Sequence, residues 1–264
     1  MGLKKRTCVL CSVENKQRIN FTGITFLTPF GSDPAKESLY LEVRRRERRV
    51  HSDEIVKKLP EIASEHPNAA EWKFRRRTLD RLKKHLPTGT PIRILDLGCG
   101  NGWMANRLTE NLLWEVWAVD LNREELEQGA RLFGREQLKF IYADVLQDVL
   151  PENHFDVIVL AASIQYFPDL QELLKTLRKL LNISGEIHII DAPFYKNEVE
   201  RTAAKQRTLH YYTQVGVPEM AGYYHHHLLS DAKDLGAVNL NDTLIVKLLQ
   251  RIKWLAPFPW LYFR

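Results

Sequence analysis

Three glycines follow a short apolar run that contains an acid, in Ile94-Leu-Asp-Leu-Gly-Cys-Gly-Asn-Gly102. Such a run predicts a buried parallel strand that enters a tight turn, where the backbone approaches a ligand closely. We expect a side chain at Gly98, Gly100 or Gly102 to fill space that a nucleotide-like ligand needs.

A second apolar run, residues 114–120, ends in Asp120. In nucleotide-binding α/β folds a carboxylate at this place, about 20 residues after the glycines, accepts hydrogen bonds from ribose hydroxyls. The alternative role for Asp120 is to cap the helix expected after it. A nicotinamide or flavin dinucleotide is the competing ligand, but its fingerprint needs a third glycine where this chain has Trp103.

Four segments together resemble the motifs of the class I S-adenosylmethionine-dependent methyltransferases. They are residues 95–102, Asp120, residues 140–144 and residues 155–163, in the order and spacing of that family. The resemblance implies an α/β fold with a doubly wound, mostly parallel seven-stranded sheet, the Rossmann-like methyltransferase fold. It also implies S-adenosyl-L-methionine as the cofactor, released as S-adenosyl-L-homocysteine.

The same resemblance implies which residues hold the cofactor. The glycine turn approaches the amino acid tail, Asp120 accepts from the ribose, and Asp144 accepts from the adenine amine; a plain turn acid is the alternative role for Asp144. The expected cofactor contacts are Asp96, Gly98, Gly100, Asn101, Gly102, Asp120, Leu121, Asp144, Val145 and Ala161.

Residues 161–168 follow the fourth strand and resemble the small-molecule branch of the family. We therefore expect a small-molecule acceptor, with a hydroxyl oxygen as the first choice and carbon or nitrogen as alternatives. The cluster His225, His226 and His227 supplies the expected catalytic base, because imidazole titrates near neutral pH. Histidines without a catalytic role are the alternative. The expected contacts to the acceptor are Tyr166, Tyr195, Tyr211 and Tyr212.

The net charge of +5 comes largely from two arginine-rich runs, residues 44–49 and 73–77. We expect solvated helix faces there and no nucleic-acid partner; an RNA methyltransferase that holds phosphates with these runs is the alternative function. A non-catalytic protein that binds the cofactor with the same fold is a third reading. Residues 254–264 are aromatic and basic, so peripheral membrane contact is the alternative to a packed final strand.

Three cysteines do not make a disulfide framework and suggest a reducing compartment. No metal site is expected, because Cys8 and Cys11 have zinc-like spacing but no second pair accompanies them. No apolar run fits a secretion signal or has the length of a membrane span, so the expected location is the cytoplasm.

Strands and helices alternate regularly from residue 92 onward, as a parallel sheet with crossover helices requires. Residues 1–86 are expected to form a helical or irregular cap, and 87–264 the Rossmann-like domain, with a helical lid inserted at 192–227. Residues 240–250 fit either a strand or a helix. Strands are expected at 92–97, 115–120, 138–142, 155–160, 186–191 and 257–263, and helices at 53–59, 71–86, 102–112, 122–133, 169–181 and 228–236.

Overall fold

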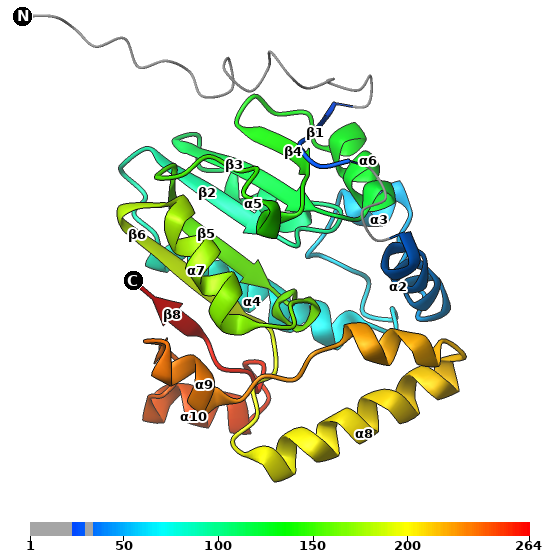
Figure 1. The fold of residues 1–264 in the computed structure, drawn as a ribbon. Helices are drawn as coiled ribbons and strands as arrows, with labels where there is room; N and C mark the ends of the chain where they lie inside the picture. The colour runs from blue at the N-terminus through cyan, green and yellow to red at the C-terminus, as the bar shows by residue number, and fades with distance from the viewer. Residues whose placement is uncertain (1–22, 30–33) are drawn as a thin grey trace, which may run out of the picture.

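The computed structural model describes residues 23–29 and 34–264, which form an α/β fold around one mostly parallel sheet (Figure 1). Its eight strands run in the order β1-β4-β3-β2-β5-β6-β8-β7. Neighbours from β1 to β6 are parallel, and β8 pairs antiparallel with both β6 and β7. The expected fold class is confirmed, with one strand more than the seven predicted. The strands are β1 Ile24–Phe26, β2 Ile92–Leu97, β3 Trp114–Asp120, β4 Leu138–Tyr142, β5 Phe155–Ala161, β6 Leu181–Ile190, β7 Val238–Asn239 and β8 Leu261–Phe263.

Helices cover both faces of this sheet and extend beyond one of its edges (Figure 1). The α-helices are α2 Pro34–Arg46, α3 Asp53–Val56, α4 Ala69–His85, α5 Trp103–Leu108, α6 Arg123–Leu132, α7 Leu170–Leu180, α8 Glu198–Val215, α9 Leu229–Asp234 and α10 Leu244–Arg251. Short 3-10 helices lie at η1 Val145–Gln147, η2 Ile164–Tyr166 and η3 Pro218–Tyr223.

Alternate residues of the central strands enter two different cores, because successive side chains of a strand point to opposite faces. Ile94 of β2 packs in the core that includes residues of α4, α5 and α6. Its neighbour Leu95 packs in the core that includes the leucines of α7. The central strands are apolar on both faces for this reason, as the sequence pattern indicated.

The extra strand comes from the N-terminal segment, where the sequence showed no alternation. β1 pairs in parallel with β4, and α2 is a helix of 13 residues that the sequence did not predict. Residues 240–250, which the sequence left undecided between a strand and a helix, contain most of helix α10. The last strand, predicted at 257–263, is shorter in the structure and is β8. The predicted helix 102–112 also shortens, since α5 ends at Leu108. The boundary between a cap and a domain at residues 86 and 87 stays a prediction.

The predicted insertion 192–227 is helical and contains α8 and η3. It packs against α2 through a small apolar cluster of Val43, Tyr212, Val217 and Met220. In Figure 1, α2 (dark blue) and α8 (yellow) stand beside the sheet. Two segments about 150 residues apart in sequence thus build one wall. None of the helices in the described ranges is long and apolar enough to cross a bilayer.

Candidate functional site

The glycine turn after β2 is held against its neighbours by packing as well as by hydrogen bonds. The Gly98 amide donates to the Val119 carbonyl at 2.8 Å, and Gly102 caps α5 in the left-handed region with φ 70°. A Cβ at Gly98 would lie 2.4 Å from the Ser163 Cβ, and one at Gly102 would lie 2.5 Å from the Phe140 ring. These two glycines therefore make room for the protein itself, and the expectation that they also leave space for a ligand stays a prediction.

Asp120 orients the turn from the end of β3. Its Oδ2 accepts from the Gly100 amide at 2.7 Å, and its Oδ1 accepts from the Asn122 amide at 2.8 Å. The alternative that Asp120 caps the next helix is wrong, because the side chain of Asn122 accepts from the Glu125 amide and caps α6. Burial, with the Glu125 charge, raises the pKa of Asp120 to about 6.

A cavity of about 310 Å³, which we call the strand-end cavity, lies beyond the carboxyl ends of β3 and β4. Asp120, Leu121, Asp144 and Val145 all line it, as the sequence predicted for an adenosine site. Asp144 also caps η1, since its Oδ1 accepts from the Leu146 amide at 3.0 Å. Its remaining lone pairs can still accept from a ligand.

A larger cavity of about 760 Å³, the central cavity, opens from the same turn. Asp96, Gly98, Gly100, Asn101 and Ala161 line it, so of the predicted cofactor contacts only Gly102 lines neither cavity. The residues shared by both cavities are Tyr40, Gly98, Ala162, Tyr166 and Met220. One ligand can therefore extend from the first cavity into the second.

Asp96 gives a direct test of whether an adenosyl amino acid fits. The residue is buried, and its Oδ2 has no hydrogen-bond partner among the described residues. Burial and the nearby Asp120 raise the pKa of Asp96 to about 7, against a hydrogen bond from the Ala105 amide. An unpartnered carboxylate oxygen in a cavity wall needs a cationic or donor group, and the ammonium of a methionine tail is such a group.

Helix α2 contributes side chains that the sequence reasoning missed. Tyr40 donates to Glu125 Oε2 at 3.3 Å, and Arg44 pairs with Glu125 Oε1 at 3.2 Å. The Glu125 carboxylate lies beside the glycine turn, 3.3 Å from where a Cβ of Gly100 would stand. Tyr40, Arg44 and Glu47 are spaced three or four residues apart, which could have indicated that their side chains share one side of a helix. The prediction missed this because the arginine run was interpreted as a solvated helix face.

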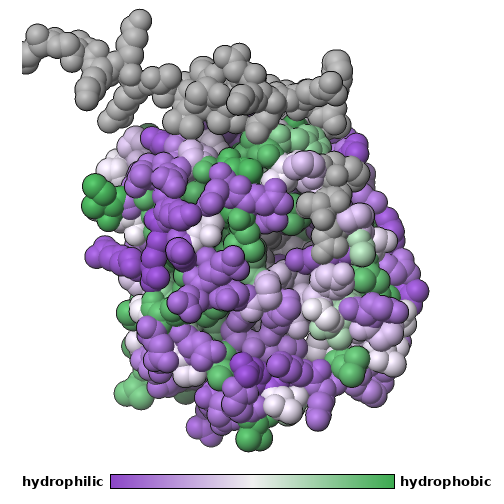
Figure 2. All heavy atoms as spheres, in the orientation of Figure 1, coloured by the Kyte–Doolittle hydropathy of each residue, from purple (hydrophilic) through white to green (hydrophobic). Residues whose placement is uncertain are grey.

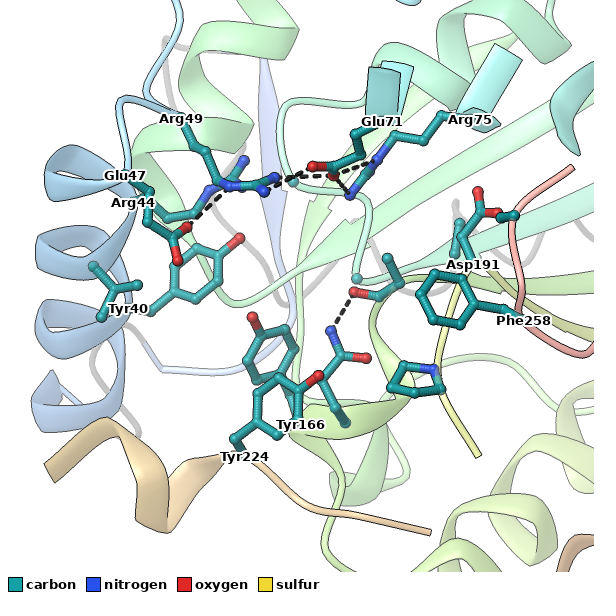
Figure 3. Close-up of a pocket in the computed structure, with 18 of the residues that line it drawn as sticks. Tyr40, Arg44, Glu47, Arg49, Glu71, Arg75, Tyr166, Asp191, Tyr224 and Phe258 are labelled. Atoms are coloured by element: carbon teal, nitrogen blue, oxygen red, sulfur yellow. Dashed lines mark hydrogen bonds and ion pairs between the residues drawn. The ribbon is translucent and has the colours of Figure 1, made fainter. Parts of the chain in front are cut away.

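A chain of ion pairs crosses the central cavity above these residues (Figure 3). Arg49 pairs with Glu47 at 3.0 Å and with Glu71 at 2.7 Å, and Arg75 pairs with Glu71 at 2.8 Å. Although burial opposes it, the two arginines lower the pKa of Glu71 to about 2. Tyr211 of α8 donates a hydrogen bond to Glu47, so the inserted helix contacts this series of ion pairs.

The expectation that both arginine runs are merely solvated helix faces is therefore wrong in part. Arg44, Arg49 and Arg75 turn into the central cavity and are held there by carboxylates. Arg45 and Arg76 pair at the surface, with Glu124 and Glu61. The outer surface in the view of Figure 2 is largely hydrophilic, with apolar side chains in smaller groups.

Asp191 stands at the end of β6, on the opposite side of the central cavity from α2 (Figure 3). It is a non-glycine residue in the left-handed region, with φ 54°. Its Oδ1 accepts from the Thr78 hydroxyl at 2.8 Å, and no described residue hydrogen-bonds its Oδ2. Burial raises the pKa of Asp191, while Arg75 lowers it. A strained backbone that presents a carboxylate to a cavity is typical of functional positions.

The four tyrosines predicted to contact an acceptor, Tyr166, Tyr195, Tyr211 and Tyr212, all line the central cavity. They come from three places in the chain, since Tyr211 and Tyr212 are neighbours in α8, and Tyr224 joins them with its ring 6.3 Å from that of Tyr166. Burial raises the pKa of Tyr166 to about 12, so its hydroxyl is neutral near pH 7. The wall is thus aromatic with neutral polar tips.

The three histidines predicted as the base lie elsewhere. His225, His226 and His227 line a separate cavity of about 850 Å³, and none of them lines the central cavity. His226 Nε2 is 2.9 Å from the Thr208 hydroxyl, and His227 Nε2 is 3.3 Å from the Ile164 carbonyl. Burial lowers the pKa of all three, that of His226 to about 4.

One group of metal-ligating types occurs in the described part of the chain, formed by His85, Glu186 and His188. The Trp260 indole donates to His188 Nδ1 at 3.0 Å, and His188 Nε2 lies 3.0 Å from Glu186. Because Nδ1 is an acceptor, a neutral His188 carries its proton on Nε2 and donates to Glu186 instead of binding a metal there. Cys8 and Cys11 lie outside the described residues.

Part of the chain is similar to known methyltransferases. Residues 94–185 match the family model described as a methyltransferase domain. An uncharacterized methyltransferase of Mycobacterium tuberculosis is 30% identical over 105 residues, which cover 40% of this chain and 52% of that protein. The 27-O-demethylrifamycin SV methyltransferase of Amycolatopsis mediterranei is 28% identical over 119 residues, or 44% of each protein. The chain spans about half the length of the curated relatives it matches.

Among solved structures, the fold resembles a phosphoethanolamine N-methyltransferase from Haemonchus contortus. The TM-score is 0.54 at 18% identity, over 80% of this chain and 48% of that one. At this identity the likeness establishes the fold and no more.

Proposed function

The chain carries a methyltransferase domain of the class I S-adenosylmethionine-dependent family, and we propose that it transfers a methyl group to a hydroxyl oxygen of a small molecule. The observation that carries the proposal is the junction of the two cavities at Gly98, Ala162 and Tyr166. With adenosine held in the strand-end cavity, these shared residues would leave the methyl-bearing end of the cofactor next to the central cavity.

The residues at hand suit S-adenosyl-L-methionine. Asp120 would accept from the ribose hydroxyls with the lone pairs that its two amide donors leave free. Asp144 and Val145 would meet the adenine, Leu121 would cover it, and Asp96 would face the ammonium. When bound, the cofactor supplies an activated methyl group for an in-line displacement, which depends on alignment of the acceptor.

The acceptor then occupies the central cavity, whose volume of about 760 Å³ lies in the range of small-molecule sites. Its tyrosines Tyr166, Tyr195, Tyr211 and Tyr212 offer apolar faces and neutral hydroxyls to a ring-containing molecule. The charges of Arg44, Arg49 and Arg75 are already balanced by glutamates, which disfavours RNA phosphates as their partners. The predicted cytoplasmic location stays a prediction.

We propose that Asp191, and not one of the three histidines, is the base that accepts the proton of the acceptor hydroxyl. The acceptor hydroxyl would take the methyl group as the bond from that group to the cofactor sulfur breaks, with S-adenosyl-L-homocysteine as the leaving group, and its proton would pass to Asp191 Oδ2. Its raised pKa makes the carboxylate a stronger base than a solvated one, and Thr78 fixes its orientation. His225, His226 and His227 remain the alternative base if the lid moves, because they now face another cavity.

The proposal is tested in two stages with the purified chain. Calorimetry with S-adenosyl-L-homocysteine checks the cofactor site, and absence of binding would refute the proposal at its base. A screen of hydroxylated ring compounds with labelled methyl donor then identifies an acceptor. Retained cofactor binding with no transfer to any hydroxyl, amine or RNA would favour a non-catalytic binding protein.

With an acceptor in hand, Asp191→Asn should lower turnover about 100-fold or more and leave cofactor affinity unchanged. Thr78→Val, which removes only the orienting hydroxyl, should have a smaller effect. Alanine at His225, His226 and His227, one at a time, is the matched comparison. If a histidine variant loses turnover and Asp191→Asn does not, the assignment of the base is reversed.

A further inference from the structure

Helix α10 presents apolar side chains to solvent. Leu244 is 87% exposed and Ile245 is 73% exposed, and Leu248, Ile252 and Trp254 are exposed as well. No residue of α10 is buried. We call these five residues the α10 face. Isolated exposed leucines are ordinary, but five on one short segment form a contiguous apolar surface of the kind that binds a partner.

The helical spacing places this apolar surface on one side. At about 100° per residue, Leu244, Ile245, Leu248 and Ile252 fall within about 100° of the helix circumference. Leu249 falls beside this arc, Val246 and Gln250 fall on the opposite side, and all three are half-buried. The apolar arc of α10 therefore continues from its half-buried side onto its solvent side, where a surface helix that packs on a core normally carries polar residues.

Basic side chains border the α10 face. From 242 to 254 the chain carries Lys247, Arg251 and Lys253 and a single acid, Asp242, which pairs with Lys247 at 2.5 Å. The first two basic residues lie beside the apolar arc on the helix, and all three are exposed. The guanidinium of Arg77 adds a fourth positive charge, 4.5 Å from the Trp254 ring.

The α10 face adjoins the central cavity through the chain itself. Leu255 and Ala256 follow Trp254 and are buried, and Ala256, Pro257 and Phe258 line the cavity. Further along, Leu261–Phe263 is a packed strand, β8. The aromatic and basic segment 254–264 thus has an exposed part, Trp254, which continues the α10 face, and a packed part that includes β8.

We propose that the α10 face binds the surface of an anionic lipid bilayer, with α10 lying in the plane of the headgroups. An outward apolar arc, an interfacial tryptophan and flanking lysine and arginine are the features that such helices use. A second copy of the chain fits the face less well, because a two-fold contact would bring the basic borders of both copies together. The proposal is independent of methyl transfer.

The test uses the full chain and sedimentation with vesicles. We expect binding to vesicles of phosphatidylcholine with about 30% phosphatidylglycerol, at least about tenfold tighter than to phosphatidylcholine alone. Added salt should weaken binding, since attraction between surface charges is screened. Equal binding to both vesicle types, or no binding to either, would overturn the proposal.

Variants locate the contact. The double variant Leu244→Gln, Leu248→Gln should lower vesicle affinity about tenfold or more, and Arg251→Gln, Lys253→Gln should remove the preference for anionic vesicles. Ile183→Gln is the matched control, because Ile183 is fully exposed at another site. Titration with S-adenosyl-L-homocysteine checks that each variant keeps its fold.

Two further outcomes would decide against the lipid. Wild-type affinity in the leucine double variant would show that another surface binds the vesicles. A dimer in sedimentation velocity that dissociates on Leu248→Gln would assign the face to a second copy. Because vesicle binding and cofactor binding are measured separately, failure of this inference is distinguishable from failure of the proposed function.

Discussion

The strand-end cavity and the central cavity share a wall but differ in how they are built. The first is formed largely by turns that directly follow β2, β3, β4 and β5, with polar groups held by backbone amides a few residues away, as in Asp144 to Leu146, although α2 and Met220 also line it. The second collects side chains from α2, α4, α8 and the C-terminal segment, held by ion pairs such as Arg49–Glu71. Local geometry therefore determines the first cavity, and long-range packing determines the second.

The largest effect should come from breaking the turn that both cavities use. Gly98→Ala adds a Cβ in the left-handed region and 2.4 Å from Ser163, so we expect a loss of about 3 kcal/mol or more in the free energy of unfolding. Gly100→Ala, also in the left-handed region, meets only the flexible end of Glu125 at 3.3 Å and should lose about 1 kcal/mol. Urea unfolding measures both, and equal losses would contradict the packing explanation.

The next prediction concerns cofactor affinity, which should depend on the strand-end cavity and not on Asp191 of the central cavity. Asp120→Asn should weaken S-adenosyl-L-homocysteine binding by about 2 kcal/mol, or roughly 30-fold, because charge-assisted hydrogen bonds to the ribose are lost. Asp191→Asn, across the central cavity, should leave that affinity unchanged. Calorimetry of both variants is the measurement. An unchanged affinity in Asp120→Asn would remove the ribose assignment.

A smaller effect concerns pH and Asp96, at the boundary of the two cavities. Its pKa of about 7 in the fold exceeds the ordinary value of 3.8, so between these pH values the native state holds a proton that the unfolded chain has lost. Stability of the ligand-free protein should therefore fall as pH rises from about 4 to about 7. Asp96→Asn should flatten this slope and raise stability at pH 8 by about 1 kcal/mol, after the cost of an unpartnered amide.

Urea unfolding across that pH range checks the expectation. Asp191→Asn is a useful second variant, because burial also raises the pKa of Asp191. A slope in Asp96→Asn as steep as that of the wild type would show that Asp96 does not titrate as described.

The smallest effect probes the long-range contact between α8 and α2. Tyr211→Phe removes the hydrogen bond to Glu47, at a partly exposed position, and should cost about 0.5 kcal/mol or less. Amide exchange of α8 should nevertheless become faster, with exchange in β2 and β3 unchanged. Unaltered exchange in α8 would mean that the apolar contacts of Tyr212 and Met220 alone hold the insertion in place.

Much of the sheet was predictable because its signals are local. The expected strands 92–97 and 138–142 match β2 and β4, and the helix expected at 122–133 matches α6 with Asn122 as its cap. The N-terminal strand β1 was not predictable in the same way. It has three residues and pairs with β4, more than 110 residues away, so its own sequence carries no register.

The residues of the site differ in the same way, because some depend on local sequence and others on long-range contacts. The proposed cofactor contacts could be expected from the resemblance to the methyltransferase motifs, which lie in turns and at strand ends that local sequence specifies. In the sequence, Asp191 is only the last residue of the strand expected at 186–191, because its importance depends on Thr78 of α4 and on the cavity that α2 and α8 help to line. The histidines differ in the opposite way: they form a conspicuous local cluster, but the fold places them beside another cavity, and their role as the base stays a prediction.

The sequence by itself determined the parallel sheet, the glycine turn and the acids at the ends of β3 and β4, because apolar periodicity and backbone freedom act within a few residues. Only the tertiary structure decided that Arg44, Arg49 and Arg75 face inward, that Asp191 lines the central cavity, and that α10 keeps apolar side chains exposed. Those outcomes depend on which charges and surfaces meet after the chain closes. Complementary partners 22 to 164 residues apart, such as Arg49 with Glu71 and Tyr211 with Glu47, cannot be paired from local pattern alone.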